Sequence, residues 1–156
     1  MKLAVFVFTF VWSPLVCTCT HAQGFSAYQA QLAHHTFTPG YTAKAIPMNG
    51  ALSASVHTFK AEDGTSVYQS DDWYKSADEA DSALDKLTKR ASHVVEQGTK
   101  KDAMGHVIGN RVELVFSHVK GASPEMVIAW RDGASIVRLR STSLPLLLDF
   151  ESQYYP

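Results

Sequence analysis

Four arginines in the C-terminal half are the side chains best suited to chemistry in this sequence. They lie in three segments in which hydrophobic and polar residues alternate, the pattern of half-buried β-strands. If the alternation holds, all four guanidinium groups share one side of three neighbouring strands. Such a cluster can hold a carboxylate or a phosphate through paired N–H donors. The predicted anion-binding residues are Arg111, Arg131, Arg138 and Arg140.

The same arginines also fit a second interpretation, in which they lie on a solvated sheet face. Glu113 and Glu125 are then their cross-strand partners. No glycine-rich phosphate-binding loop accompanies the arginines. A pocket beside Arg111 and Arg138 would favour the anion site, whereas a flat face with every charge paired would favour the solvated surface.

Other residue types give no recognisable catalytic or metal-binding pattern. The seven histidines include no His-x-x-x-His or His-Glu-x-x-His spacing, so the sequence predicts no zinc site of that kind. The Gly-x-Ser-x-Gly motif of serine hydrolases does not occur. The pair Asp71-Asp72 could suggest a glycosidase, but adjacent acids before a helix are more typical of a loop. We expect no cofactor and no metal.

The N-terminal residues have the order of parts found in secretory signal peptides. A positive start at Lys2 precedes an apolar run from Leu3 to Trp12. This run is shorter than the roughly 20 residues of a membrane-spanning helix. Small side chains occupy positions 20 and 22. We therefore predict a signal peptide over residues 1–22, cleavage between Ala22 and Gln23, and export to the periplasm or the exterior.

Both cysteines, Cys17 and Cys19, lie inside the predicted signal peptide. The residues before them do not fit a bacterial lipoprotein signal, so we expect no lipid anchor at either. The mature chain then contains no cysteine, which excludes disulfides and thiolate metal sites. Its 13 basic and 15 acidic residues give a net charge of about −2. This near balance does not indicate nucleic acid or an anionic membrane as a partner, and we expect no membrane span.

Turn signals divide the rest of the chain. Residues 23–50 contain glycines and prolines without clear periodicity and are expected to form an irregular N-terminal arm. A single α+β domain is expected over residues 51–156. Alternating runs on both sides of Asp63-Gly64 predict a hairpin. Residues 77–91 follow a capping box at Ser76 and Glu79 and carry one apolar stripe, which predicts an amphipathic helix.

Four alternating runs after this helix predict an antiparallel meander. The first run, His93–Lys101, fits a strand, and continuation of the helix to Gln97 is an alternative. Ser143 and Pro145 indicate the start of a C-terminal helix. The expected fold is an antiparallel sheet of five to six strands packed against one main helix. The C-terminal helix or the N-terminal arm is expected to cover its second face.

Several turns and strand ends resemble those of small exported bacterial domains of unknown function. They are the turn from Asp102 to Gly105, the motif Gly109-Asn110-Arg111, the run Trp130-Arg131-Asp132-Gly133 and the segment STSLPLLLDFESQYY. The resemblance covers residues 52–155. These domains are hypothetical proteins without an assigned activity, so the resemblance implies the fold and export but no mechanism.

The sequence as a whole favours an exported, non-enzymatic domain that binds a small anionic ligand or an envelope protein. The alternative is a small exported, hydrolase-like enzyme with an arginine-lined anion site. An enzyme needs polar groups that converge in a pocket, whereas an interaction domain needs an exposed apolar patch.

Overall fold

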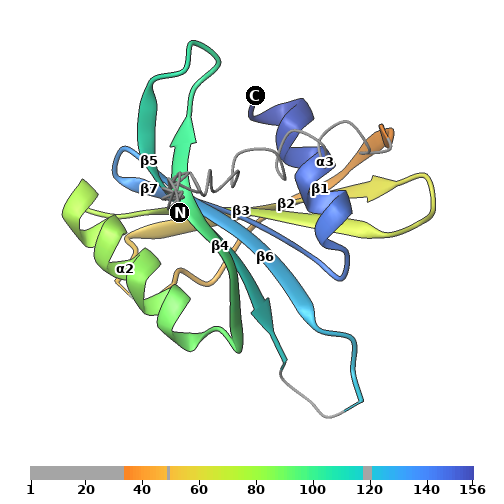
Figure 1. The fold of residues 1–156 in the computed structure, drawn as a ribbon, viewed down its shortest axis with the longest axis horizontal. Coiled ribbons are helices and arrows are strands. Elements are labelled where there is room, and N and C mark those ends of the chain that lie inside the picture. Colours follow the sequence, from red (N-terminus) through yellow and green to blue (C-terminus); the bar gives the residue numbers. More distant parts are fainter. Residues whose placement is uncertain (1–33, 49, 118–120) are drawn as a thin grey trace, which may run out of the picture. The chain divides into compact units, whose positions relative to one another are not determined.

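A computed structural model describes residues 34–48, 50–117 and 121–156 (Figure 1). The elements in chain order are β1 (Phe37–Lys44), β2 (Ser53–Ala61), β3 (Ser66–Trp73), α2 (Ala77–Arg90), β4 (His93–Lys101), β5 (Val107–Phe116), β6 (Glu125–Asp132), β7 (Ser135–Ser141) and α3 (Leu144–Tyr154). All seven strands form one antiparallel sheet in the order β1-β2-β3-β7-β6-β5-β4. The α+β prediction is confirmed, with more strands than expected. The predicted signal peptide, its cleavage position and both cysteines lie outside the described residues.

Strand β1 lies within the segment that the sequence predicts to be irregular. It pairs with β2 from Phe37 opposite Ala61 to Lys44 opposite Ser55, with an irregularity between Pro39 and Thr42. Proline lacks an N–H, so within a sheet it is confined to edge strands and bulges. It also interrupts the alternating pattern that would reveal the strand. The prediction of an irregular arm over residues 23–50 is therefore wrong for β1, which belongs to the sheet.

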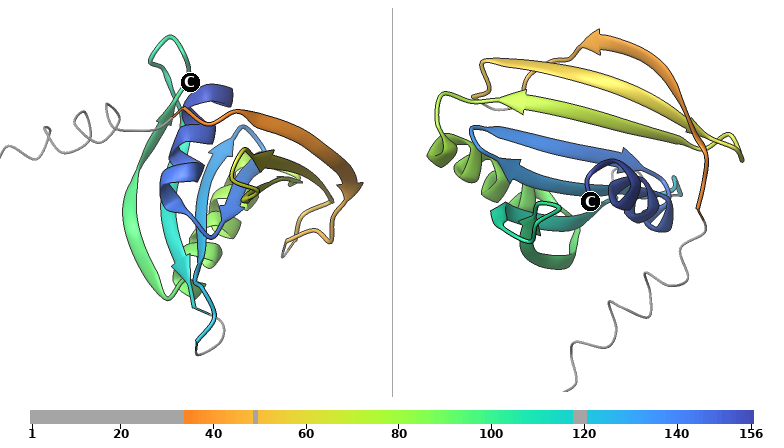
Figure 2. Two further views of the ribbon diagram at one scale, coloured as in Figure 1. Left: turned by 90° about the vertical axis from the view of Figure 1, so that its right-hand side faces the viewer. Right: turned by 90° about the horizontal axis from the view of Figure 1, so that it is seen from above.

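The predicted meander is confirmed, because β4, β5, β6 and β7 are successive neighbours in the sheet. The helix stops at Arg90 and a strand begins at His93, so the alternative of a longer helix is wrong. The β-branched Val94 and Val95 favour this strand. The strands are strongly twisted relative to one another, and β4 and β5 cross the direction of β1, β2 and β3 (Figures 1 and 2).

Helix α2 begins as its sequence predicts. The Ser76 hydroxyl accepts a hydrogen bond from the Glu79 N–H at 3.2 Å, and the Glu79 carboxylate accepts one from the Lys75 N–H at 3.2 Å. These bonds satisfy backbone donors that a helix start otherwise leaves open. The apolar stripe, Ala80, Ala83, Leu84 and Leu87, is buried against β5, β6 and β7.

Helix α3 covers the other face of the same strands. Its N-cap is Ser143, whose hydroxyl accepts a hydrogen bond from the Leu146 N–H. Leu147 and Phe150 are fully buried in a second core that includes Trp130 and Val137. Because successive strand residues point to opposite faces, the central strands have one core under each helix. The expectation of a second cover is confirmed, and α3 provides it.

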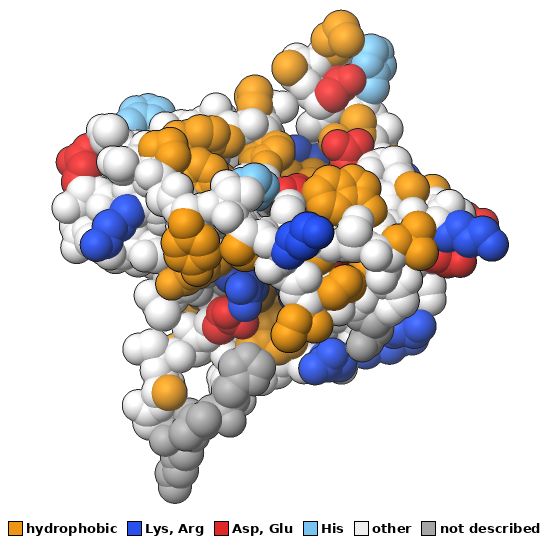
Figure 3. Space-filling model, turned by 180° about the vertical axis from the view of Figure 1, so that it is seen from behind, with side chains coloured by type: hydrophobic (Ala, Val, Ile, Leu, Met, Phe, Trp, Pro, Cys, Tyr) orange, Lys and Arg blue, Asp and Glu red, His pale blue; other side chains and the backbone are white. Residues whose placement is uncertain are grey.

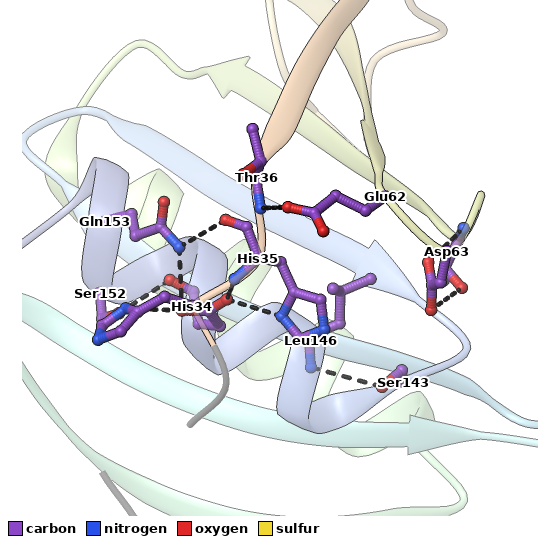
Figure 4. Close-up of polar contacts among 11 residues, drawn as sticks. His34, His35, Thr36, Glu62, Asp63, Ser143, Leu146, Ser152 and Gln153 are labelled. Atoms are coloured by element: carbon purple, nitrogen blue, oxygen red, sulfur yellow. Dashed lines mark hydrogen bonds and ion pairs between the residues drawn. The ribbon is translucent and has the colours of Figure 1, made fainter. Parts of the chain in front are cut away.

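Asp149 of α3 anchors the chain just before β1, at the place where Figure 4 shows Gln153 beside His35. Its fully buried carboxylate accepts a hydrogen bond from the His35 N–H at 2.7 Å and lies 2.8 Å from His35 Nδ1. Gln153 Nε2 donates to the same carboxylate at 3.0 Å and to the His35 carbonyl at 3.1 Å. These bonds position Phe37, whose ring packs edge-on against Phe150.

We expect Asp149→Asn to lower the free energy of unfolding at pH 7 by about 2 kcal/mol or more, because an amide cannot accept all these hydrogen bonds. Burial raises the pKa of Asp149, but the hydrogen bonds from His35 and Gln153 outweigh it and hold the pKa below 3.8. The stabilisation is therefore present above about pH 3.8 and disappears as the pH falls through the lower folded-state pKa.

Urea unfolding of the wild type and the variant at pH 7 and near pH 2 checks this prediction. The difference in unfolding free energy should be large at pH 7 and small in acid. Equal stabilities at pH 7 would contradict the role of Asp149 as an anchor.

Candidate anion-binding site

Strand registers decide which arginines share a face of the sheet. Arg111 of β5 lies opposite Trp130 of β6, which lies opposite Val137 of β7. Side chains that are directly opposite lie on one face, so Arg111 lies on the face covered by α3. Arg138 lies opposite Ala129 and therefore on the α2 face.

The prediction that all four arginines share one face is therefore wrong. Arg131, Arg138 and Arg140 lie on the α2 face, whereas Arg111 lies on the α3 face. Alternation divides each strand into two faces, but it does not say which of them continues into the next strand. The register of each hairpin makes that assignment, and a shift by one residue reverses it.

Arg111 belongs to a buried network of four charges. Its Nε and Nη2 atoms donate to Glu151 at 2.9 and 2.6 Å, and Nη2 also lies 2.8 Å from Glu113 Oε1. Lys100 Nζ lies 3.3 Å from Glu151 Oε1. Burial raises the pKa of Glu113, and Arg111 opposes the rise. Two cations thus face two carboxylates, and Arg111 has protein acceptors where the sequence predicts a ligand.

Arg131 links the sheet to α2. Its Nε donates to Asp81 Oδ1 at 2.9 Å, and Asn110 Nδ2 donates to the same oxygen at 3.4 Å. Asp81 lies in the N-terminal half of α2. Arg131 therefore lies on the same face as Arg138 and Arg140 but has a different, structural contact.

A pocket of about 470 Å³ lies beside Arg138 and Arg140 on the α2 face. This volume falls within the range of small-molecule sites, about 300–1,000 Å³. Its described lining residues are Ile46, Pro47, Met48, Leu87, Arg90, Ser92, Phe116, Ser117, Glu125, Val127, Arg138 and Arg140. Half of them are apolar, and three arginines face one glutamate. Figure 3 looks onto this side of the molecule and shows basic and acidic side chains adjoining in a recess bordered by hydrophobic ones.

Arg138 forms part of the buried polar floor of this region. Its Nε donates to Ser70 Oγ at 3.0 Å, and its Nη2 lies 3.5 Å from Asp72 Oδ2. Asp72 is fully buried, and its Oδ1 accepts a hydrogen bond from the Met48 N–H at 3.0 Å. Burial lowers the pKa of Arg138, and Asp72 acts in the opposite direction. Asp72 therefore joins the arginine to the loop that forms one wall of the pocket.

Arg140 is less completely paired than Arg138. Its Nη1 lies 3.4 Å from Glu125 Oε1, and its guanidinium lies over the Tyr68 ring at 5.8 Å from the centroid. Its Nε is buried and has no hydrogen-bond partner within the described part of the chain. A buried N–H without an acceptor is unfavourable. A ligand oxygen would reach this closed-off N–H only after the Arg140 side chain turned, but the side chain as a whole is 33% exposed and lines the pocket.

Asp72 shows what sequence reasoning missed. The sequence assigns Asp71-Asp72 to a loop, but both residues lie in β3, and that assignment is wrong. As neighbours in a strand they face opposite sides, so they do not form a carboxylate pair. Asp72 meets Arg138, which is distant in the sequence, and Asp71 accepts a hydrogen bond from Gln69 Nε2. The only feature of the sequence that could have indicated this role of Asp72 is an acidic residue within an alternating run.

The described lining of the pocket includes three arginines, whose guanidinium groups are able to hold an anion, and no histidine or cysteine. Ser92 Oγ, which also lines the pocket, accepts a hydrogen bond from the Ser117 N–H at 3.0 Å. Over the described ranges, no three His, Cys, Asp or Glu side chains are grouped as metal ligands. None of the described helices is long and apolar enough to cross a membrane.

Comparisons with protein-family models, with characterised proteins and with solved structures gave no match to this chain. The resemblance to small exported bacterial domains therefore stays a prediction. The interpretation of the pocket depends on its own geometry and charge.

The pairing of Asp72 with Arg138 leads to a stability prediction. Asp72→Ala leaves Arg138 buried without its carboxylate, and we expect the unfolding free energy to fall by about 3–5 kcal/mol. Replacing both residues, as Asp72→Ala with Arg138→Met, removes both charges and should restore part of this loss. Urea unfolding of the two single variants and the double variant measures the coupling. Additive losses in the double variant would show that the two side chains do not interact.

Proposed function

We propose that this protein is an exported, non-enzymatic domain that binds a small amphiphilic anion in the pocket beside Arg138 and Arg140. One observation carries the proposal. Arg140 lines a half-apolar pocket of ligand size, and its buried Nε lacks a hydrogen-bond partner among the described residues. Both halves of such a ligand would find matching groups.

The polar half of the ligand is a carboxylate or a phosphate. Guanidinium groups bind these anions through charge-assisted hydrogen bonds, which are stronger than neutral ones. Arg90 and Arg140 both line the pocket, so more than one cation faces the bound head group. Glu125 is the one acid among the described lining residues and leaves the site with an excess of positive charge.

The apolar half of the ligand packs against the core. Leu87, Phe116 and Val127 line the pocket and also belong to the hydrophobic core beneath α2. They offer a preformed apolar wall, and removing apolar surface from water contributes about 25 cal/mol per Å². A short hydrophobic anion should therefore bind more tightly than the same head group without a tail.

The enzyme alternative takes second place because the described lining residues include no nucleophile beside a base. The proposed role is retention of a ligand, for which an anion-binding group and an apolar wall are sufficient.

Binding of decanoate and decyl phosphate below their micellar concentrations tests this function by isothermal titration calorimetry. We expect Arg140→Gln to weaken binding about 10- to 100-fold, because a hydrogen bond to a charged group contributes about 1.5–3 kcal/mol. Arg131→Gln is the matched control, since Arg131 lies on the same face and contacts Asp81 outside the pocket. Butyrate, which lacks most of the tail, should bind more weakly.

The proposal fails if neither decyl anion binds at low salt. It also fails if Arg140→Gln and Arg131→Gln have the same effect on affinity.

The export part of the proposal depends on the N-terminal pattern of charge, apolar run and small residues. N-terminal sequencing of the product recovered from the periplasm or medium of a bacterial host should give a chain that begins at Gln23. Recovery of a product that retains Met1 would overturn this part and leave the pocket unaffected.

A further inference from the structure

An exposed apolar side chain stands at the mouth of the arginine pocket. Ile46 lines the pocket and is 92% exposed. Hydrogen bonds hold the backbone on both sides of it: the Ala45 N–H donates to the Ala54 carbonyl at 3.1 Å, and the Met48 N–H donates to Asp72. The loop therefore presents Ile46 to the solvent from an anchored position. Leu52, in the same connection between β1 and β2, is 71% exposed.

Basic side chains flank the same mouth. Lys86, Lys89 and Arg90 occupy exposed positions at the C-terminal end of α2, and Arg90 lines the pocket. Across the described residues, none of the three has an ion-pair partner. Asp78 and Glu79 lie at the opposite end of the helix, whereas Asp85 is exposed beside Lys86 and Glu125 lines the pocket. The end of α2 and the pocket mouth therefore carry an excess of basic over acidic side chains on a chain whose net charge is −1.

We infer that the pocket mouth docks on an anionic lipid surface, and that the ligand is an anionic lipid taken from it. This inference rests on the proposed function and names the class and source of its ligand. Protein surfaces that carry an exposed hydrophobic side chain close to Lys and Arg bind at the interface of anionic bilayers. Ile46 enters the interface, the basic end of α2 contacts lipid phosphates, and the arginines of the pocket receive the head group.

The charge distribution favours a lipid surface over a freely diffusing ligand. A soluble anion would need only the half-buried Arg138 and Arg140, and it gives no reason for an exposed isoleucine held at the rim. A lipid has an anionic head group and an apolar chain in one molecule, which matches both the rim and the lining of the pocket. Basic and apolar side chains therefore occur together both at the rim of the pocket and in its lining.

Vesicle flotation tests the inference with the purified protein. We expect binding to vesicles of phosphatidylcholine with 30% phosphatidylglycerol, and little binding to phosphatidylcholine alone. Lys86→Glu combined with Lys89→Glu should reduce the bound fraction more than 10-fold, and Ile46→Ser should also reduce it. Neither lysine lines the pocket, so in salt sufficient to screen the reversed charges the lysine variant should keep the wild-type affinity for decanoate.

Matched controls come from the turn of the β4-β5 hairpin, at the opposite end of these two strands from the pocket residues Ser92 and Phe116. Lys101→Glu alters an exposed basic residue, and Met104→Ser alters an apolar side chain that is 80% exposed. Both should bind vesicles as the wild type does. All proteins share one N-terminus, so its contribution cancels in the comparison.

The outcomes separate this inference from the function on which it rests. If decanoate binds but phosphatidylglycerol vesicles do not, the docking inference is overturned and the proposed function stands. The inference is also overturned if Ile46→Ser and the double lysine variant lose no more vesicle binding than Lys101→Glu and Met104→Ser. If neither decanoate nor vesicles bind, both proposals fail.

Discussion

Strand β7 lies in the middle of a sheet with a hydrophobic core on each face, so a charged side chain on it must find a partner within the protein or at the end of a covering helix. Uncompensated charges in such a setting are strongly unfavourable. Val137 and Leu139 pack in the hydrophobic core on the α3 face, whereas Arg138 and Arg140 point to the α2 face. The pocket occurs where α2 ends at Arg90 while β7 continues to Ser141.

The two faces meet this constraint in different ways. Under α3, the charges of Arg111 and Lys100 are balanced by Glu113 and Glu151, although Glu113 Oε1 makes no hydrogen bond within the described residues. On the α2 face, Asp72 and Ser70 engage Arg138, but Arg140 has a long contact with Glu125 and a buried Nε without an acceptor in the described structure. A buried network whose charges balance is typical of a structural role. Incomplete pairing beside an apolar cavity is typical of a ligand site.

Local patterns in the sequence predicted much of the fold. The capping box at Ser76 and Glu79 placed the start of α2, Ser143 and Pro145 placed α3, and the Asp-Gly turn placed the first hairpin. Each of these features depends on residues a few positions apart, so its physics is contained in a short window. Strand β1 was missed because Pro39 and Gly40 interrupt its alternation, although an edge strand tolerates both.

The candidate site was only half predictable, because its geometry depends on long-range register. Arg138 and Arg140 were identified from their types, but only the β5-β6 register shows that Arg111 lies on the opposite face. Asp72 and the wall residues Met48 and Phe116 come from distant segments, and no local pattern joins them. The most direct test of the central claim is an NMR titration that follows the arginine Nε–H signals as decanoate is added. The signals of Arg140 and Arg138 should shift while that of Arg111, held by Glu151, stays unchanged; no shift at Arg140, or equal shifts for all arginines, would contradict the account.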